Sequence, residues 1–175
     1  PGGLYWQVRV PGLQRSPGAR WHRGVQDGVS AIEKLPRVID ALIELERQFH
    51  ASTGDDPMEE GRAPFSLVIG KVSGGFYETL TAGEAILRGG AYFAPGLGDI
   101  AGVMESFRRA IDDANAADSF LKGHPARCEF LHHDDSTRQS PQIPLAVHMC
   151  GVLEEHGGKR GVHPGPFACD MRHLV

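Results

Sequence analysis

Hydrophobic and polar residues alternate along LYWQVRV, residues 4–10, near the start of the chain. Tyr5, Gln7 and Arg9 fall on one side of an extended backbone, and Trp6, Val8 and Val10 fall on the other. A period of two residues with one apolar side predicts a half-buried β-strand. Apolar runs bounded by turn residues predict three more strands, over residues 65–75, 83–94 and 126–133.

A helical period is clearest over residues 30–50, SAIEKLPRVIDALIELERQFH. Ser30 and Glu33 predict a capping box, in which each side chain bonds a free backbone N–H at the helix start. Pro36 removes one backbone hydrogen bond and predicts a kink near Ile32. The apolar stripe expected to face the core comprises Ile32, Leu35, Ile39, Leu42, Leu45 and Phe49.

A second amphipathic helix is predicted over residues 99–118, with Asp99 as its N-cap. Its inward face comprises Ile100, Val103, Phe107, Ala110 and Ile111. The element order is then strand, helix, strand, strand, helix, strand. That order predicts an α+β, ferredoxin-like βαββαβ fold, with a four-stranded antiparallel sheet and two helices on one face.

The predicted sandwich is complete by about residue 133, so we expect residues 4–133 to form one domain. After the polar break DDSTRQSPQ, an apolar helix is predicted over residues 143–156. An apolar segment, GPFACDMRHLV, follows at residues 165–175. Neither piece has a place in the small sandwich, so residues 134–175 are expected to be part of a different domain.

Composition narrows the classes of function. Hydrophobic residues make up 41% and charged residues 23% of the chain, as is usual for a globular protein. The net charge of −4 argues against a nucleic-acid partner, which requires a basic face. The chain has neither an apolar run of membrane-spanning length nor a signal-peptide pattern at its start. Three widely spaced cysteines predict no disulfide framework, so a cytoplasmic location is expected.

Two groups of residues suggest metal binding at first sight. His132, His133, Asp134 and Asp135 are consecutive, but neighbours on a strand point to opposite faces and cannot easily share one ion. The polar end of a strand running into a linker explains them as well. Cys150 and Cys169 lie near histidines but lack the spacing of a zinc motif, so we interpret them as buried structural thiols. Gly74-Gly75 and Gly89-Gly90 lack the other residues of a phosphate loop.

Three segments together resemble a known enzyme family. They are ARWHRGVQDGVSAIEKL at residues 19–35, KVSGGFYETL at residues 71–80 and PFACDMRHLV at residues 166–175. In this order they resemble the zinc metallopeptidase family that includes acetylornithine deacetylase, succinyl-diaminopimelate desuccinylase, aminoacylase and carboxypeptidase G. The family inserts a βαββαβ lid, or dimerisation domain, into a larger zinc-binding domain. The resemblance implies that residues 4–133 are the lid and that residues 134–175 are a partial segment of the catalytic domain.

The resemblance also implies a chemistry for the parent enzyme. Two zinc ions would activate a water molecule to hydrolyse the amide bond of an N-acyl amino acid or small peptide. The family's metal ligands and general-base Glu would fall before residue 1 or after residue 175. This chain is therefore expected to bind no zinc and to be inactive alone. Family lids commonly form a homodimer through a helix and an edge strand of the sheet.

Site residues are carried over from the family position by position. A lid His that steadies the tetrahedral intermediate should fall at Ser16 or Pro17, and neither residue can replace it. His22 matches a second family His and is a catalytic candidate; the alternative is an exposed loop residue. The lid Asn after the Gly pair corresponds to Glu78, a substrate-binding candidate that would repel a substrate carboxylate.

Two further candidates concern the substrate's carboxylate. Arg172, in the sequence CDMR, corresponds to a family Arg that binds this group, and Asp170 would orient its neighbours. The alternative is a structural ion pair between Asp170 and Arg172. The lid Arg expected before the turn at residues 95–96 is missing, and Arg88 is a weak substitute.

Two other functions remain open from the sequence. A stand-alone ferredoxin-like interaction or sensing module without chemistry fits the βαββαβ pattern equally well, because fold does not fix function. The helix at residues 143–156 and the segment at 165–175 argue against such a module. A dimerising but non-catalytic family member would fit the missing lid His and Asn.

Overall fold

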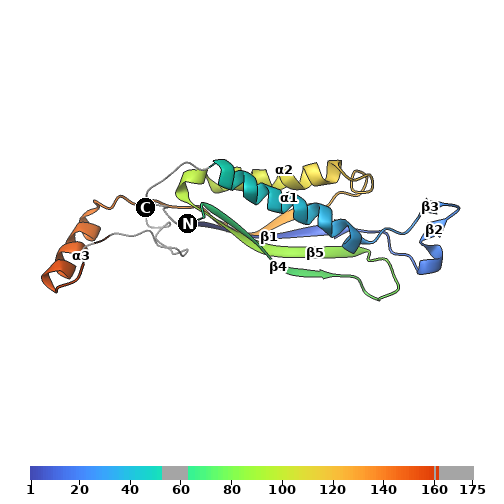
Figure 1. Ribbon diagram of the computed structural model, residues 1–175, viewed down its shortest axis with the longest axis horizontal. Helices are drawn as coiled ribbons and strands as arrows, with labels where there is room; N and C mark the ends of the chain where they lie inside the picture. Colours follow the sequence, from blue (N-terminus) through green and yellow to red (C-terminus); the bar gives the residue numbers. More distant parts are fainter. Residues whose placement is uncertain (53–62, 160, 162–175) are drawn as a thin grey trace.

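The computed structural model describes residues 1–52, 63–159 and 161. Four long strands and two long helices form its main body (Figure 1), and their order along the chain is the predicted one. They are β1 (Gly2–Pro11), α1 (Ala31–Ser52), β4 (Phe65–Gly74), β5 (Glu84–Phe93), α2 (Ile100–Ala116) and β6 (Arg127–Asp134). The smaller elements are η1 (Pro17–Ala19), β2 (Trp21–His22), β3 (Val25–Gln26), η3 (Pro95–Leu97) and a third helix, α3 (Pro144–Glu155).

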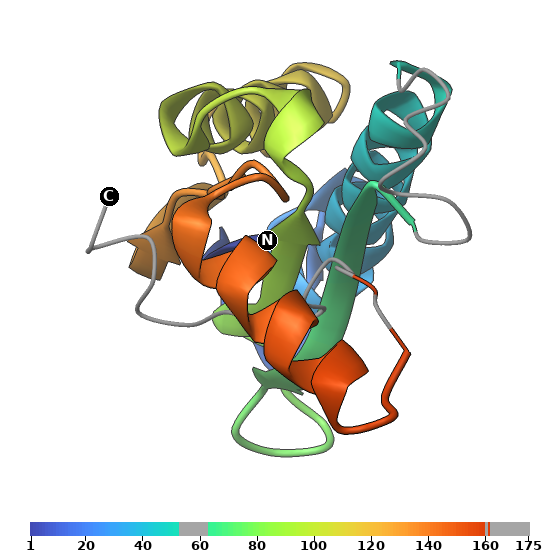
Figure 2. The ribbon, with the colours of Figure 1, turned by 90° about the vertical axis from the view of Figure 1, so that its left-hand side faces the viewer.

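The four long strands form one antiparallel sheet in the order β4-β5-β1-β6. Both α1 and α2 lie on one face of this sheet (Figures 1 and 2). The predicted α+β, ferredoxin-like fold is therefore confirmed.

The core lies between the sheet and the two helices. The predicted alternation of β1 is confirmed, since Trp6, Val8 and Val10 are buried on the helix side and Tyr5 is half exposed. Phe107 of α2 lies at the centre and is surrounded by other aromatic rings, those of Trp6, Phe65 and Phe130. Because these rings come from four elements, the aromatic cluster ties β1, β4 and β6 to α2.

On the other face of the sheet, Gln7 is also buried. Its side-chain amide donates to Glu129 (3.1 Å) and its amide oxygen accepts from Arg88 (2.6 Å). Because both ends of the amide have partners, burial of this polar group on β1 carries little penalty. Arg88, the weak substitute for a substrate-binding Arg, therefore donates a hydrogen bond to the neighbouring strand on the surface of the sheet.

The start of α1 differs from the expectation. Ser30 Oγ accepts from the backbone N–H of Ala82 (3.3 Å), and the Glu33 carboxylate accepts from Arg20 (2.6 Å), so the predicted capping box is wrong. Ser30 thus bonds the β4–β5 connection, and Glu33 bonds the segment that follows β1. Ile32 is 47% exposed there, and Val38 is fully buried in its place on the inward stripe. The remaining stripe residues are buried or partly buried, as expected: Leu35, Ile39, Leu42, Leu45 and Phe49.

The second helix follows the prediction closely. Asp99 Oδ1 accepts from the backbone N–H of Gly102 (2.8 Å), so Asp99 is the N-cap as expected. Near the other end of α2, the buried side chain of Asn115 bonds both the N–H (2.8 Å) and the C=O (3.0 Å) of Ala126. This pair of bonds fixes the connection from α2 to β6. The predicted inward residues are buried or partly buried: Ile100, Val103, Phe107, Ala110 and Ile111.

The third helix, α3, lies beyond the end of the sheet where β1 begins (Figures 1 and 2). The helix predicted over residues 143–156 is thus present. None of its residues belongs to the core cluster of the part of the chain that the structure describes. Its exposed apolar side chains are Leu145, Val147, Met149, Val152 and Leu153. The apolar segment at residues 165–175 lies outside the described residues.

Candidate functional site

A hollow lined by three chain segments lies at the end of the sandwich opposite α3. We call it the loop pocket; its lining comes from residues 15–20, 30–33 and 74–81, and its volume is about 670 Å³. The first segment follows β1, the second opens α1, and the third joins β4 to β5. A hollow of this size is in the range of small-molecule sites.

Hydrogen bonds hold the three segments of the loop pocket together. Thr81 Oγ accepts from the backbone N–H of Arg15 (2.7 Å) and donates to the carbonyl of Leu13 (2.7 Å). The carbonyl of Ala82 accepts from the backbone N–H of Ala31 (2.8 Å), the first residue of α1. Gly12 is required at this junction, because a Cβ there would lie 2.1 Å from the Ala82 carbonyl oxygen.

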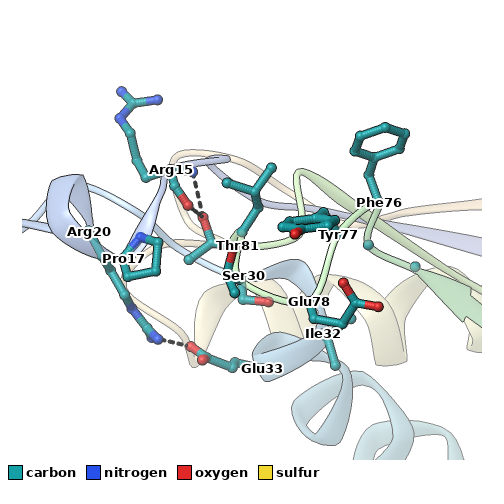
Figure 3. Close-up of a pocket in the computed structure, with 14 residues that line it drawn as sticks. Arg15, Pro17, Arg20, Ser30, Ile32, Glu33, Phe76, Tyr77, Glu78 and Thr81 are labelled. Atoms are coloured by element: carbon teal, nitrogen blue, oxygen red, sulfur yellow. Dashed lines mark hydrogen bonds and ion pairs between the residues drawn. The ribbon is translucent and has the colours of Figure 1, made fainter.

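Both arginines that line the loop pocket are paired with carboxylates. Arg20 donates to Glu33 (2.6 Å; Figure 3). Arg15 donates to Asp27 (2.7 Å), and this bond and the guanidinium charge hold the pKa of the Asp27 carboxyl below its usual value. Neither guanidinium is left as an unopposed positive charge in the pocket.

Glu78 lines the loop pocket without such a partner. Among the described residues, none forms a hydrogen bond or ion pair with its carboxylate. Its neighbours on the loop, Phe76 and Tyr77, are 89% and 58% exposed. In Figure 3, Glu78 and these two aromatic residues lie on one side of the pocket, and the Arg20–Glu33 pair lies on the other.

The structure brings only some of the sequence-predicted site residues together. Pro17, one of the two positions expected for the lid His, lines the loop pocket with Glu78. His22 is exposed in β2, where it pairs with Val25 of β3, and it does not line the pocket. Its charge does help lower the pKa of Asp27, so it lies near the Arg15–Asp27 pair. Asp170 and Arg172 lie outside the described residues.

Sequence reasoning missed Arg15, Arg20 and Thr81 as pocket residues. Arg15 and Arg20 belong to a segment whose Pro, Gly and Arg content predicted only a loop. Thr81 bonds residues 66 and 68 positions away along the chain, which no local pattern reveals. The pocket therefore depends on contacts that only the folded topology creates.

The residues of the described ranges do not fit a zinc site. Within them, no group of three or more His, Cys, Asp or Glu side chains lies close enough to hold a metal ion. His132 Nε2 and Asp134 Oδ2 lie 2.6 Å apart, which places these two residues on one face of β6 and makes them an ion-pair candidate. The metal ligands that the resemblance implies are thus not found in this part of the chain.

The described cysteines are sheltered from solvent. Burial raises the pKa of the Cys128 thiol to about 12, so it is not a nucleophile at neutral pH. Cys150 of α3 is buried, as the interpretation of a structural thiol expects. Cys169 lies outside the described residues. The helices that the structure describes also lack the length and apolar character needed to cross a bilayer.

No protein-family model matches the sequence, and no curated protein matches it either. Solved structures do match the fold. A tripeptidase from Staphylococcus aureus subsp. aureus Mu50 is similar over 99% of this chain, with a TM-score of 0.63 and 14% identity. The dipeptidase Dug1p from Saccharomyces cerevisiae is similar over 97%, with a TM-score of 0.62 and 14% identity. A hydantoinase/carbamoylase family amidase from Burkholderia ambifaria is similar over 99%, with a TM-score of 0.61 and 15% identity.

These matches cover only part of the larger proteins. The chain spans 40% of the tripeptidase, 44% of the dipeptidase and 38% of the amidase. The similar structures are thus peptidases and amidases, and at these identities the likeness concerns the fold.

Proposed function

We propose that this chain is the lid, or dimerisation, portion of a zinc-dependent amidohydrolase of the cytoplasm. The parent would hydrolyse the amide bond of an N-acyl amino acid or a small peptide, with two zinc ions held outside the described residues. One observation carries the proposal: three hydrolases that act on different amides each contain a region similar to at least 97% of this chain. In each of them this region is less than half of the protein.

The exposed apolar side chains of α3 support a division near residue 134. Leu145, Met149 and Leu153 are exposed on α3, and within the described ranges no element covers them, as one normally would cover such a surface. In the proposal, residues 4–133 are the lid, and α3 packs against the rest of a catalytic domain in the parent. Asp170 and Arg172 would belong to that second portion and serve the substrate's carboxylate there.

The homodimer would form along β4 and α1. Residues 70–74 of β4 are all exposed at the edge of the sheet, and Val72 is 54% exposed. Edge strands with free backbone groups pair readily with a second copy. The other half of this edge is covered, because the Glu46 carboxylate of α1 accepts from the backbone N–H of Leu67 (2.8 Å).

Native mass spectrometry of the purified chain, with and without added zinc, tests the proposal. We expect a metal-free dimer of about twice 18.9 kDa, and no hydrolysis of N-acetyl amino acids by the chain alone. Val72→Lys should shift the dimer to monomer, because a charge at a paired edge is costly. Leu131→Lys, on the opposite edge strand and equally exposed, is the control and should leave the dimer intact. Zinc bound tightly at fixed stoichiometry, or hydrolysis by the chain itself, would overturn the assignment as a lid.

A dimerising but non-catalytic relative is the second candidate. The position of Pro17 in the loop pocket, with His22 outside it, favours this alternative. Assay of the full-length protein that contains this chain, loaded with zinc, separates the two. Amide hydrolysis supports the enzyme, and a zinc-loaded dimer without hydrolysis supports the relative.

A further inference from the structure

We propose that the loop pocket binds an alkylammonium group, so that the parent's substrate carries a positive charge where it meets this lid. As a statement about a substrate, this inference rests on the proposed function. As a statement about a binding site, it rests on the charges and surfaces of the pocket itself.

The balance of charge is the first argument. Arg15 and Arg20 are each neutralised by a carboxylate at 2.7 Å and 2.6 Å. Glu33, in the N-terminal turn of α1 that also lines the pocket, is the carboxylate paired with Arg20. Glu78 then remains as the charge without a partner among the described residues. Glu78 would repel an anion placed beside it, whereas a cation there would gain an ion pair.

The backbone holds Glu78 in place at the pocket wall. The N–H of Leu80 donates to the carbonyl of Tyr77 (3.1 Å), and this bond closes a turn with Glu78 inside it. Gly75 begins the loop with a φ of +77°, a backbone conformation that favours glycine. Glu78 therefore lies in a hydrogen-bonded turn at the wall of the pocket.

The apolar surfaces of the loop pocket select the rest of the ligand. Ile32 lines the pocket and is 47% exposed, so part of its apolar surface is available to a ligand. Tyr77 offers an aromatic ring beside Glu78, and such rings attract cations over their faces (Figure 3). An alkyl chain resting on Ile32 with an ammonium near Glu78 and Tyr77 would satisfy all three residues.

The test is an NMR titration of the full chain with three probes of equal length: pentylammonium, 1-pentanol and pentanoate. We expect pentylammonium to shift the amide signals of residues 75–81 and to bind about threefold more tightly than 1-pentanol, since an exposed ion pair adds a modest gain. Pentanoate should bind more weakly than 1-pentanol. The preference for pentylammonium should shrink at high salt because ions screen exposed charges.

Glu78→Gln should abolish the preference for pentylammonium over 1-pentanol. Glu155→Gln, at the end of α3, removes the same charge far from the pocket and should retain the preference. Equal binding of the three probes, no binding of any, or an unchanged preference in Glu78→Gln would overturn the inference. These readouts involve neither oligomeric state nor hydrolysis. A monomer with the preference would therefore refute only the proposed function, and a dimer without it would refute only this inference.

Discussion

The side chain of Asp118, just beyond α2, accepts three hydrogen bonds. Its carboxylate accepts from Lys34 Nζ (2.9 Å) and from the backbone N–H groups of Phe120 (2.9 Å) and Leu121 (3.0 Å). Burial opposes ionisation, but the Lys34 bond and the two backbone bonds prevail and lower the pKa of Asp118. The carboxylate thus links the start of α1 to the turn that follows α2.

The Asp118 link predicts a pH-dependent stability. A pKa lowered in the folded state means stabilisation that is present above the usual carboxyl value of 3.8 and is lost as the pH falls through the folded value. Asp118→Asn keeps an oxygen for the two backbone N–H groups and loses the ion pair. We expect it to cost about 1 kcal/mol at pH 7 and almost nothing at low pH.

Thermal unfolding of the wild type and Asp118→Asn between about pH 2.5 and pH 7 measures this difference. Asp112→Asn, exposed on α2, is the control and should show no comparable trend. A difference in unfolding temperature that stayed constant across this range would contradict a role for the Asp118 charge.

At the residue scale, the sequence predicted those side-chain hydrogen bonds whose two partners are close together along the chain. Asp99 was identifiable as an N-cap because its partner, Gly102, is three residues away. The sequence around Ser30 predicts a capping box equally well. Its hydroxyl instead accepts from the backbone N–H of Ala82, 52 residues away, because the helix start is buried there. Glu78 was identified only through the resemblance, and its lack of a partner is visible only in the folded chain.

At the scale of elements, β5 shows how closely the strands approach. Gly89 lies between Trp6 of β1 and Ile69 of β4. A Cβ at this position would lie 1.9 Å from the carbonyl oxygen of Val68 and 2.5 Å from the Trp6 ring. Because Val68 O is backbone and Trp6 is fully buried, neither can move aside cheaply.

Gly89→Ala should therefore destabilise the fold by about 3 kcal/mol or more. Gly70→Ala is the matched control, since a Cβ on this neighbouring strand meets nothing within 4 Å. We expect the control to change the free energy of unfolding by less than about 0.5 kcal/mol. Chemical denaturation of both variants gives these values, and equal stability would show that β4 can shift to admit the methyl group.

The limits of helices and strands were largely predictable from the sequence. Strands expected over residues 65–75 and 126–133 are found at Phe65–Gly74 and Arg127–Asp134, because apolar alternation and turn residues are local signals. The direction in which α1 faces was less predictable. Its stripe includes Val38 and leaves Ile32 exposed, because the sheet and the loop pocket decide which side is covered.

At the scale of the whole molecule, the core ends before α3. Phe130 is the last residue that packs with the core cluster of the described chain, where its ring meets Phe107 edge to face with centroids 6.1 Å apart. The order of elements was enough to predict this sandwich. It could not predict the loop pocket, because residues 74–81 meet two segments from the first part of the chain there.

Removal of residues 141–175 should thus leave residues 4–133 folded, with one cooperative unfolding transition. The expected change in the free energy of unfolding is within about 1 kcal/mol, since α3 contributes no residue to the core. Calorimetry and circular dichroism of the shortened chain measure this. A large loss of cooperativity would move the domain boundary beyond residue 134.

The bonds from Thr81 to Arg15 and from Ala82 to Ala31 have a consequence for ligand association. They join the base of the loop pocket to the segment after β1 and to α1, so its backbone is already ordered when the chain folds. A ligand that enters meets a preorganised surface and loses little affinity to conformational entropy there. The amide protons at this base should therefore exchange with solvent as one slow cooperative unit, whether or not the pocket is filled.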